Sequence, residues 1–276
     1  FQLADGFLQL HSRGLCYRDI SFGNVFFDPK TGDVLICDND NVGIDGKATA
    51  DVLGTPRFMA PEIVTGAADP GSASDLWSLS VLLFYLLTVH HPLEGAREAA
   101  IKCLDLPAMT RLYGTHPLFI FHPKDTRNAP VPGLHDNALA YWPLYPEWLR
   151  ALFTRAFVDG IADPQSGRVR ESEWRGALLN LRDSIFNCSG CGSELFYDKG
   201  APRCWSCGTN PRLPYRLRVD NSTMVMLNAD TQLFPHHMGA LYDLTAPTAE
   251  VARHPKDPSI WGLKNLSQGA WTATPR

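Results

Sequence analysis

The sequence predicts an α+β chain of several domains: a mostly helical first part, a small segment held by four cysteines, and a small all-β domain at the end. Three observations predict this. Apolar residues recur at helical spacing over Leu3–Leu8 and fill the stretch Leu76–Val89. Two C-x-x-C-G turns begin at Cys188 and Cys204. From residue 212 onward, short apolar runs lack helical spacing and are typical of strands.

Composition limits the classes of protein. A chain of 276 residues with 45% hydrophobic content can form several buried cores. A formal net charge of −4 argues against a surface built as a whole for nucleic acid or for an anionic membrane. The apolar stretch Leu76–Val89 is too short to span a bilayer, so it predicts a buried core helix. No secretory signal is visible and the cysteines fit a reducing compartment, so we expect a cytoplasmic protein.

Three polar side chains lie in two neighbouring loops within Tyr17–Asp40. Asp19 is followed five residues later by Asn24, and Asp38 comes directly after an apolar run. One carboxylate can accept the proton of an attacking hydroxyl, while a carboxylate and a carboxamide can hold Mg²⁺ on nucleotide phosphates. The set therefore fits phosphoryl transfer from ATP. We prefer Asp38 to Asp40 as the metal ligand because it has the better spacing from Asn24.

Landmarks in one order along the chain resemble the eukaryotic-type protein kinase family. They are Tyr17-Arg18-Asp19 with Asn24, Asp38-Asn39-Asp40, Gly54-Thr55-Pro56 leading to Ala60-Pro61-Glu62, Ser74-Asp75-Leu76-Trp77, and Asp163-Pro164 with Arg168 and Trp174. The resemblance implies the helical large lobe of a serine/threonine protein kinase that takes ATP and Mg²⁺ and acts on a protein substrate.

By the same resemblance, Asp19 is the catalytic base and Thr55 positions the substrate hydroxyl beside it. Asn24 and Asp38 would hold Mg²⁺. Phe26 and Cys37 would form the floor under the nucleotide.

Arg18 resembles the arginine that pairs with a phosphorylated residue of the activation segment, for which Thr49 is the best-placed acceptor. We nevertheless favour the interpretation that Thr49 is an ordinary exposed loop residue that is not phosphorylated. Glu62 and Arg168 would form a buried structural ion pair. Asp75 would either bond to the catalytic-loop backbone or cap its own helix.

Departures from the family pattern keep a pseudokinase open. Ser21 stands where a phosphate-contacting lysine is usual, Asn39 replaces an apolar plug, and Asp40 replaces glycine. Tyr17 replaces histidine but keeps an aromatic body that can pack inward. None of these changes touches the three residues that carry the chemistry.

The sequence opens inside a helical pattern, and the family's Gly-rich loop, strand lysine and partner glutamate would all precede Phe1. We therefore expect a fragment with a kinase large lobe over 1–186, a zinc ribbon over 187–211 and a small β domain over 212–276. Such a fragment would have little kinase activity alone. The proline- and aromatic-rich segment 95–146 is interpreted as lobe packing, with a partner groove as the alternative.

Four thiolates in two C-x-x-C-G pairs, separated by 12 residues, predict a closed tetrahedral Zn²⁺ site. The ligands would be Cys188, Cys191, Cys204 and Cys207. Disulfides or a redox pair are the alternative, but redox motifs come singly on a βαβ pattern. The other cysteines, Cys16, Cys37 and Cys103, lie in apolar segments and are interpreted as core residues.

Basic residues and Trp205 near the ribbon could bind single-stranded nucleic acid, although a solvated face is favoured, so we do not expect nucleic acid or a membrane as a partner. His236-His237 is interpreted as a surface turn, with metal binding as the alternative.

A kinase lobe with a C-terminal ribbon, together with Ser21 and Asn39, resembles bacterial kinases of tellurite-resistance-associated clusters. That resemblance implies a von Willebrand A protein and a PP2C-type phosphatase as partners. The alternatives are a pseudokinase scaffold whose ribbon and tail dock a partner protein, and a nucleic-acid-binding ribbon protein.

Overall fold

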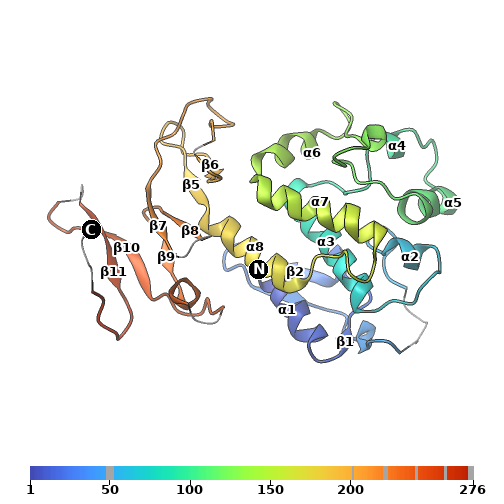
Figure 1. The fold of residues 1–276 in the computed structure, drawn as a ribbon, viewed down its shortest axis with the longest axis horizontal. Coiled ribbons are helices and arrows are strands. Elements are labelled where there is room, and N and C mark those ends of the chain that lie inside the picture. The colour runs from blue at the N-terminus through green and yellow to red at the C-terminus, as the bar shows by residue number, and fades with distance from the viewer. Residues whose placement is uncertain (48–52, 201, 220–222, 240–241, 258–259, 273–276) are drawn as a thin grey trace. The chain divides into compact units, whose positions relative to one another are not determined.

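The computed structural model describes residues 1–276 except 48–52, 201, 220–222, 240–241, 258–259 and 273–276. The chain forms two compact units, Phe1–Leu179 and Asn180–Arg276 (Figure 1). The division falls inside helix α8 (Glu171–Asp183), so this helix supplies residues to both units.

The first unit is mostly helical. Its elements are α1 (Gln2–His11), β1 (Leu15–Cys16), η1 (Phe22–Asn24), β2 (Val25–Phe27), β3 (Val34–Ile36), η2 (Asn39–Asn41), β4 (Gly43–Ile44), α2 (Pro61–Val64), α3 (Ser72–Thr88), α4 (Ala96–Ala99), α5 (Leu106–Met109), η3 (Thr110–Thr115), η4 (Thr126–Asn128), α6 (Asp136–Tyr141), η5 (Trp142–Leu144), α7 (Glu147–Ala162) and the first part of α8.

Helix α3 is the centre of this unit, and α7 lies across it (Figure 1). Because its sequence is apolar on nearly all sides, α3 can only be stable when it is buried on nearly all sides. Phe84 of α3 packs edge-on against Phe119, Phe153 and Phe157, at ring-centroid distances of 5.7, 5.3 and 5.7 Å. Such pairs add about 0.5–1.5 kcal/mol each beyond area burial. The predicted buried core helix is confirmed.

Two short antiparallel pairs place the loops that carry the predicted site. Strand β1 pairs with β4, and β2 pairs with β3 in the register Val25↔Ile36. The loop between β1 and β2 holds Asp19 and Asn24, while Asp38 follows β3 directly. The β2–β3 pairing therefore brings the two polar loops to the same end of one hairpin.

The second unit consists of short strands, apart from the end of α8 and one 3₁₀ turn. Its strands and turn are β5 (Ile185–Asn187), β6 (Glu194–Phe196), β7 (Tyr215–Arg218), β8 (Met224–Leu227), β9 (Gln232–Leu233), η6 (Pro235–Met238), β10 (Ala249–Arg253) and β11 (Trp261–Asn265). Strands β5–β6 and β7–β8 form two hairpins, and β11-β10-β9 form a three-stranded sheet. The predicted α+β character of the whole chain is confirmed.

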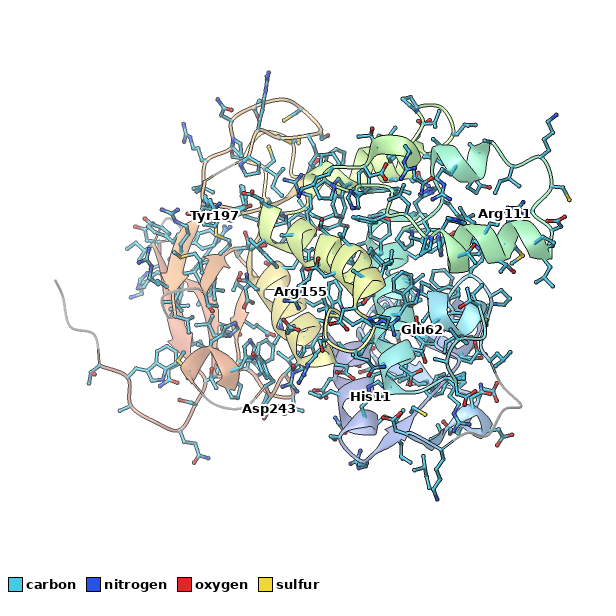
Figure 2. The ribbon with its side chains drawn as sticks, turned by 45° about the vertical axis from the view of Figure 1, so that its right-hand side comes forward. His11, Glu62, Arg111, Arg155, Tyr197 and Asp243 are labelled. Carbon is cyan, nitrogen blue, oxygen red and sulfur yellow. The ribbon has the colours of Figure 1, made fainter. Side chains whose placement is uncertain are left out.

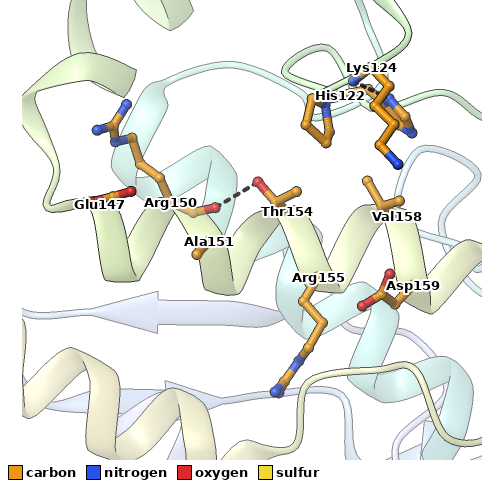
Figure 3. Close-up of a pocket in the computed structure, with 10 residues that line it drawn as sticks. His122, Lys124, Glu147, Arg150, Ala151, Thr154, Arg155, Val158 and Asp159 are labelled. Atoms are coloured by element: carbon orange, nitrogen blue, oxygen red, sulfur yellow. Dashed lines mark hydrogen bonds between the residues drawn. The ribbon is translucent and has the colours of Figure 1, made fainter.

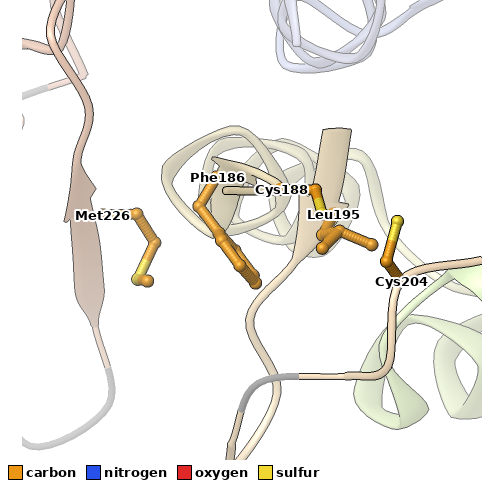
Figure 4. Close-up of a cluster of buried hydrophobic side chains, with 5 residues drawn as sticks. All are labelled: Phe186, Cys188, Leu195, Cys204 and Met226. Carbon is orange, nitrogen blue, oxygen red and sulfur yellow. The ribbon is translucent and has the colours of Figure 1, made fainter. Parts of the chain in front are cut away.

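The β7–β8 hairpin supplies side chains to two separate cores. On one face, Met226 packs with Phe186, Leu195 and the two buried cysteines of the ribbon (Figure 4). On the other face, Val225 packs with Leu233 of β9 and Ala249 of β10. Successive residues of a strand point to opposite faces, so adjacent residues of β8 reach both clusters. The four-cysteine segment and the three-stranded sheet are thus joined through one hairpin.

Candidate active site and metal centre

The carboxylate of Asp19 is held from both sides. Its Oδ1 accepts hydrogen bonds from the backbone N–H and the hydroxyl of Thr55, both at 2.7 Å. Its Oδ2 accepts a bond of 2.9 Å from the side-chain amide of Asn24. The structure thus brings together three of the residues that the sequence singled out.

Asn24 is arranged with its donor group toward Asp19. Its Nδ2 also donates to the backbone carbonyl of Asp19 at 2.9 Å. Among the described residues, no donor reaches Oδ1 of Asn24, so this oxygen is free to accept a cation. The backbone of Asn24 meanwhile accepts the N–H of Cys37 at 2.9 Å, which ties the first loop to the second.

Asp38 begins the second loop in a left-handed conformation, with φ 58° and ψ 59°. A non-glycine residue in this region carries strain of about 1–3 kcal/mol, and such strain clusters at functional sites. The side chain of Asp38 is exposed, and its Oδ2 accepts a bond of 2.9 Å from the amide of Asn41. Among the described residues, no donor reaches Oδ1 of this carboxylate.

Tyr17 begins the loop that holds Asp19, directly after β1. It is buried, and its hydroxyl donates a short hydrogen bond to the backbone carbonyl of Cys37. Burial, followed by the negative charges of Asp38 and Asp19, raises the pKa of Tyr17 to about 12. Both carboxylates therefore lie near the phenol of Tyr17. The sequence, in which this tyrosine stands in place of the family's histidine, did not predict this proximity.

Asp75 of α3 fixes the backbone of the first loop. Its carboxylate accepts the N–H of Tyr17 at 2.6 Å and the N–H of Arg18 at 2.8 Å. Arg18 has φ 74°, a strained value for a non-glycine residue. The bonds to Asp75 help to hold it there. Of the two roles left open by the sequence, the bond to the catalytic-loop backbone is the one observed.

The guanidinium of Arg18 lies against the backbone of β4. A Cβ added to Gly43 would come within 2.1 Å of Nη2 of Arg18, so only glycine allows this approach. Nη2 also donates to the carbonyl of Lys47 at 3.4 Å. The predicted phosphate acceptor, Thr49, lies outside the described residues, and its pairing with Arg18 stays a prediction.

The predicted nucleotide floor lies on the β2–β3 hairpin. Phe26 is 57% exposed, and its cross-strand neighbour Leu35 is 62% exposed. Cys37 at the end of the hairpin is half-buried. An open apolar surface beside two polar loops suits a flat base, but the role of Phe26 and Cys37 stays a prediction.

The four cysteines of the second unit form one cluster. Their sulfurs all lie within 4.8 Å of one another, with Cys188–Cys207 at 3.7 Å and Cys191–Cys204 at 3.6 Å. Disulfide sulfurs would be about 2.05 Å apart. Four sulfurs about 2.3 Å from one Zn²⁺ would be about 3.8 Å from one another in a tetrahedron. The donor set and its spacing therefore fit zinc.

The two halves of this cluster repeat one backbone pattern. The N–H of Gly192 donates to the carbonyl of Cys188, and the N–H of Gly208 donates to that of Cys204, both at 2.9 Å. Both glycines have positive φ, 79° and 73°, which closes each turn around its sulfurs. Hydrogen bonds from Thr209 and the Gly190 N–H lower the pKa of Cys188 to about 6, whereas desolvation and the neighbouring thiols raise the pKa of Cys204 to about 11. A thiolate is the form that binds metal.

A second group, Asp183, His236 and His237, also brings three potential ligand atoms close together. His237 is buried, with Nδ1 accepting the N–H of Phe234 at 2.9 Å and Nε2 lying 3.0 Å from Asp183. Because Nδ1 accepts, Nε2 carries the proton and has no lone pair for a metal. The interpretation of these histidines as a surface turn is wrong for His237, which anchors a turn to the end of α8.

A hollow of about 750 Å³ lies along α7, lined on that helix by Arg150, Thr154 and Val158 and from the preceding loop by Lys124 (Figure 3). Cations and carboxylates both line it, including Glu147 and Asp159. None of the residues discussed above for phosphoryl transfer is among its lining. We assign it no role.

Two other sequence interpretations concern cysteines and membranes. Cys16 is buried as expected, but Cys103 is exposed, so its interpretation as a core residue is wrong. Leu104 and Leu106 next to it are also exposed, because this apolar stretch lies in an open loop and the first turn of α5.

Within the described part of the chain, no helix is long and apolar enough to cross a membrane.

Sequence comparisons agree with this arrangement. Residues 1–139 match the family described as protein kinase domain. Probable serine/threonine-protein kinase CCRP1 of Zea mays is 35% identical over 34% of this chain and 15% of its own length. CBL-interacting serine/threonine-protein kinase 17 of Arabidopsis thaliana is 34% identical over 36% of this chain and 24% of its own length. Protein kinase gsk3 of Schizosaccharomyces pombe is 27% identical over 68% of this chain and 54% of its own length.

The chain thus spans between 15% and 54% of these relatives. All three come from eukaryotes, so the resemblance to bacterial kinase clusters stays a prediction.

Proposed function

The chain belongs to the protein kinase family, and on that premise we propose that it carries the large lobe of an ATP-dependent serine/threonine kinase acting on a protein hydroxyl. The observation that supports this most is that both carboxylate oxygens of Asp19 accept hydrogen bonds, Oδ1 from Thr55 and Oδ2 from Asn24. A base that must accept a proton needs a fixed position beside the acceptor hydroxyl. Thr55 and Asn24 give Asp19 that fixed position.

The residues present fit Mg²⁺ and a nucleotide. Among the described residues, no hydrogen-bond donor reaches Oδ1 of Asn24 or Oδ1 of Asp38. The two loops that carry these oxygens are connected by the hydrogen bond from the Cys37 N–H to the Asn24 carbonyl. Oxygen ligands are what Mg²⁺ prefers, usually together with substrate phosphates. Bound there, the ion would neutralise charge on the transferred phosphoryl group.

In this proposal each residue has one task. Asp19 accepts the proton of the substrate hydroxyl through its carboxylate, and the hydroxyl of Thr55 keeps that carboxylate oriented. Asp75 keeps the loop backbone in the strained conformation that presents Asp19. Phe26 lies under the base of the nucleotide. Glycine-rich or lysine-bearing elements of the family's small lobe would supply the rest of the cleft.

The ribbon is proposed to be a structural Zn²⁺ site with Cys188, Cys191, Cys204 and Cys207 as ligands. Four thiolates fill the coordination sphere, so such a site stabilises a fold rather than performing catalysis. The domains we propose are those expected from the sequence: a kinase large lobe over 1–186, the zinc ribbon over 187–211 and a small β domain over 212–276.

A pseudokinase scaffold is the second candidate, with ribbon and tail docking a partner protein. Ser21 supports it: this residue is buried and cannot supply the phosphate-contacting cation expected there. A von Willebrand A protein and a PP2C-type phosphatase remain the partners that the bacterial resemblance implies.

The test is transfer of radiolabelled γ-phosphate from ATP by the full-length protein to itself or to a mixed protein substrate. We expect Asp19→Asn to lower the rate by about 10²–10⁴-fold, the usual contribution of a positioned base. Asp38→Asn should also abolish most transfer. Asp28→Asn is the matched control, because Asp28 is exposed in the turn between β2 and β3 and serves only its own loop.

Transfer that survives both Asp19→Asn and Asp38→Asn would remove this assignment. Absence of transfer by the unchanged protein, with zinc bound and the fold intact, would favour the scaffold instead.

A further inference from the structure

Asn41 is a buried carboxamide three residues after Asp38. It is 7% exposed, although the carboxylate it serves is open to solvent. Its Nδ2 donates to Oδ2 of Asp38 at 2.9 Å, and its backbone N–H donates to the carbonyl of Asp38 at 3.3 Å. Asn41 therefore holds Asp38 through both its side chain and its backbone.

Tyr17 holds the same segment from the loop that bears Asp19. Its hydroxyl contacts the carbonyl of Cys37, the residue immediately before Asp38. The peptide before Asp38 is thus held by Tyr17, and the carboxylate of Asp38 is held by Asn41. The positions after Asp38 that differ from the family pattern, Asn39 and Asp40, are both exposed and pack no apolar plug into the lobe.

We propose that Asn41 is the positioning residue for Asp38: its amide holds Oδ2 so that Oδ1 is presented to a divalent cation. This inference rests on the proposed function, because it assumes that Asp38 ligates Mg²⁺. The strained φ of Asp38 means that the conformation persists only if its surroundings hold it. Here the hydrogen bonds from the side chain and the backbone of Asn41 do so.

The physical reason is orientation. A carboxylate on an exposed loop can rotate, and a cation gains little from a ligand that must first be ordered. A donor bound to one oxygen fixes the plane of the group and leaves the other oxygen for the metal. Groups that orient a metal ligand in this way typically contribute 10–100-fold to metal affinity or activity. Asn41 donates through an amide, which stays a donor at any pH in the physiological range.

The experiment measures Mn²⁺ binding to the full-length protein with ATP present, followed by water-proton relaxation. The variants are Asn41→Ala, the matched control Asn39→Ala, and Asp38→Asn as the reference for loss of the ligand itself. Asn39 is the same residue type two positions earlier, exposed and without a side-chain hydrogen bond among the described residues. Thermal unfolding of each variant is recorded alongside.

We expect Asn41→Ala to weaken Mn²⁺ binding by about 10–100-fold, while Asn39→Ala stays within about twofold of the unchanged protein. Excess Mg²⁺ should restore phosphate transfer in Asn41→Ala, since only cation affinity is lost. If Asn41→Ala lowers the unfolding midpoint, Asn41→Leu, which keeps the volume and removes the amide, must show the same loss of affinity in a folded protein.

The outcomes separate the two proposals. Unchanged Mn²⁺ affinity in Asn41→Ala and Asn41→Leu, with weakened binding in Asp38→Asn, overturns the role of Asn41 and leaves the proposed function standing. Unchanged affinity in Asp38→Asn overturns the metal role of Asp38 and the present inference together.

Discussion

Nε2 of His11 lies 3.0 Å from Oδ2 of Asp75, the carboxylate oxygen that also accepts the N–H of Tyr17. Nδ1 of the same ring contacts Glu171, so the imidazole of His11, which is labelled in Figure 2, bridges carboxylates of α3 and α8. Burial alone would lower the pKa of His11, but the hydrogen bonds and charges of Asp75 and Glu171 outweigh it and raise that pKa to about 9. At neutral pH the ring is therefore a cation. Its positive charge offsets the negative charge of Asp75, the residue that holds the backbone of the loop bearing Asp19.

This bridge predicts a loss of stability at alkaline pH. The pKa of His11 in the folded state is above its ordinary value, so the stabilisation is fully present below about pH 6.5 and is lost as pH rises through about 9. The full difference is on the order of 3 kcal/mol. Urea unfolding at about pH 6 and about pH 10 measures it.

His11→Gln supplies the comparison, because glutamine does not titrate. The unfolding free energy of this variant should change less between the two pH values than that of the unchanged protein. His116→Gln is the control, since His116 is exposed. An identical pH dependence in His11→Gln and the unchanged protein would show that the bridge contributes nothing.

The ion pair between Glu62 and Arg168 predicts a large structural effect. The two side chains meet at 2.7 Å and are 17% and 2% exposed, respectively, and Arg168 also donates to the carbonyl of Ala73 at 2.6 Å. Removing one partner leaves a buried charge unpaired, which typically costs about 3–5 kcal/mol. We expect Glu62→Gln to lower the unfolding free energy by about that amount, as measured in urea.

Asp125→Asn is the paired control, because its partner Arg127 lies on the surface with an 82% exposed side chain. Exposed pairs are screened by water, so no change in the unfolding midpoint is expected there. Equal effects of Glu62→Gln and Asp125→Asn would contradict a buried pair.

Local patterns in the sequence predicted the parts of the site that local chain geometry determines. The five-residue offset from Asp19 to Asn24 and the two C-x-x-C-G turns are short enough for sequence spacing to fix which atoms meet. The sequence also predicted that α3 is buried, because apolar residues occupy nearly all sides of this helix.

The features that the sequence did not predict depend on contacts between distant segments. His237 is buried because Asp183, 54 residues earlier, accepts its Nε2–H. Cys103 is exposed together with Leu104 and Leu106, because packing by other segments, and not the apolar character of the stretch, decides burial there. The sequence did not predict the role of Asn41, because its bond to Asp38 depends on the local 3₁₀ turn η2; an asparagine three residues after a predicted metal-binding aspartate is the one local signal for it.

The shared hairpin β7–β8 predicts that zinc removal affects more than the ribbon. Met226 belongs to one buried cluster with Phe186, Cys188 and Cys204 (Figure 4), so loss of the metal that holds those sulfurs should loosen one face of the hairpin. Because Val225 on the opposite face packs against β9 and β10, the disturbance should reach the three-stranded sheet. We expect about one Zn²⁺ per chain, and faster amide hydrogen exchange in β8 and β10 after chelation.

Cys207→Ser should reproduce the effect of chelation without a chelator, since three ligands bind Zn²⁺ more weakly than four. Cys103→Ser is the control, because Cys103 is exposed and is not part of the cluster. Unchanged exchange in β10 after zinc loss would mean that the sheet β11-β10-β9 folds independently of the ribbon. Faster exchange in both would show that ribbon and tail form one cooperative unit, since the adjacent residues Val225 and Met226 of β8 belong to the two clusters.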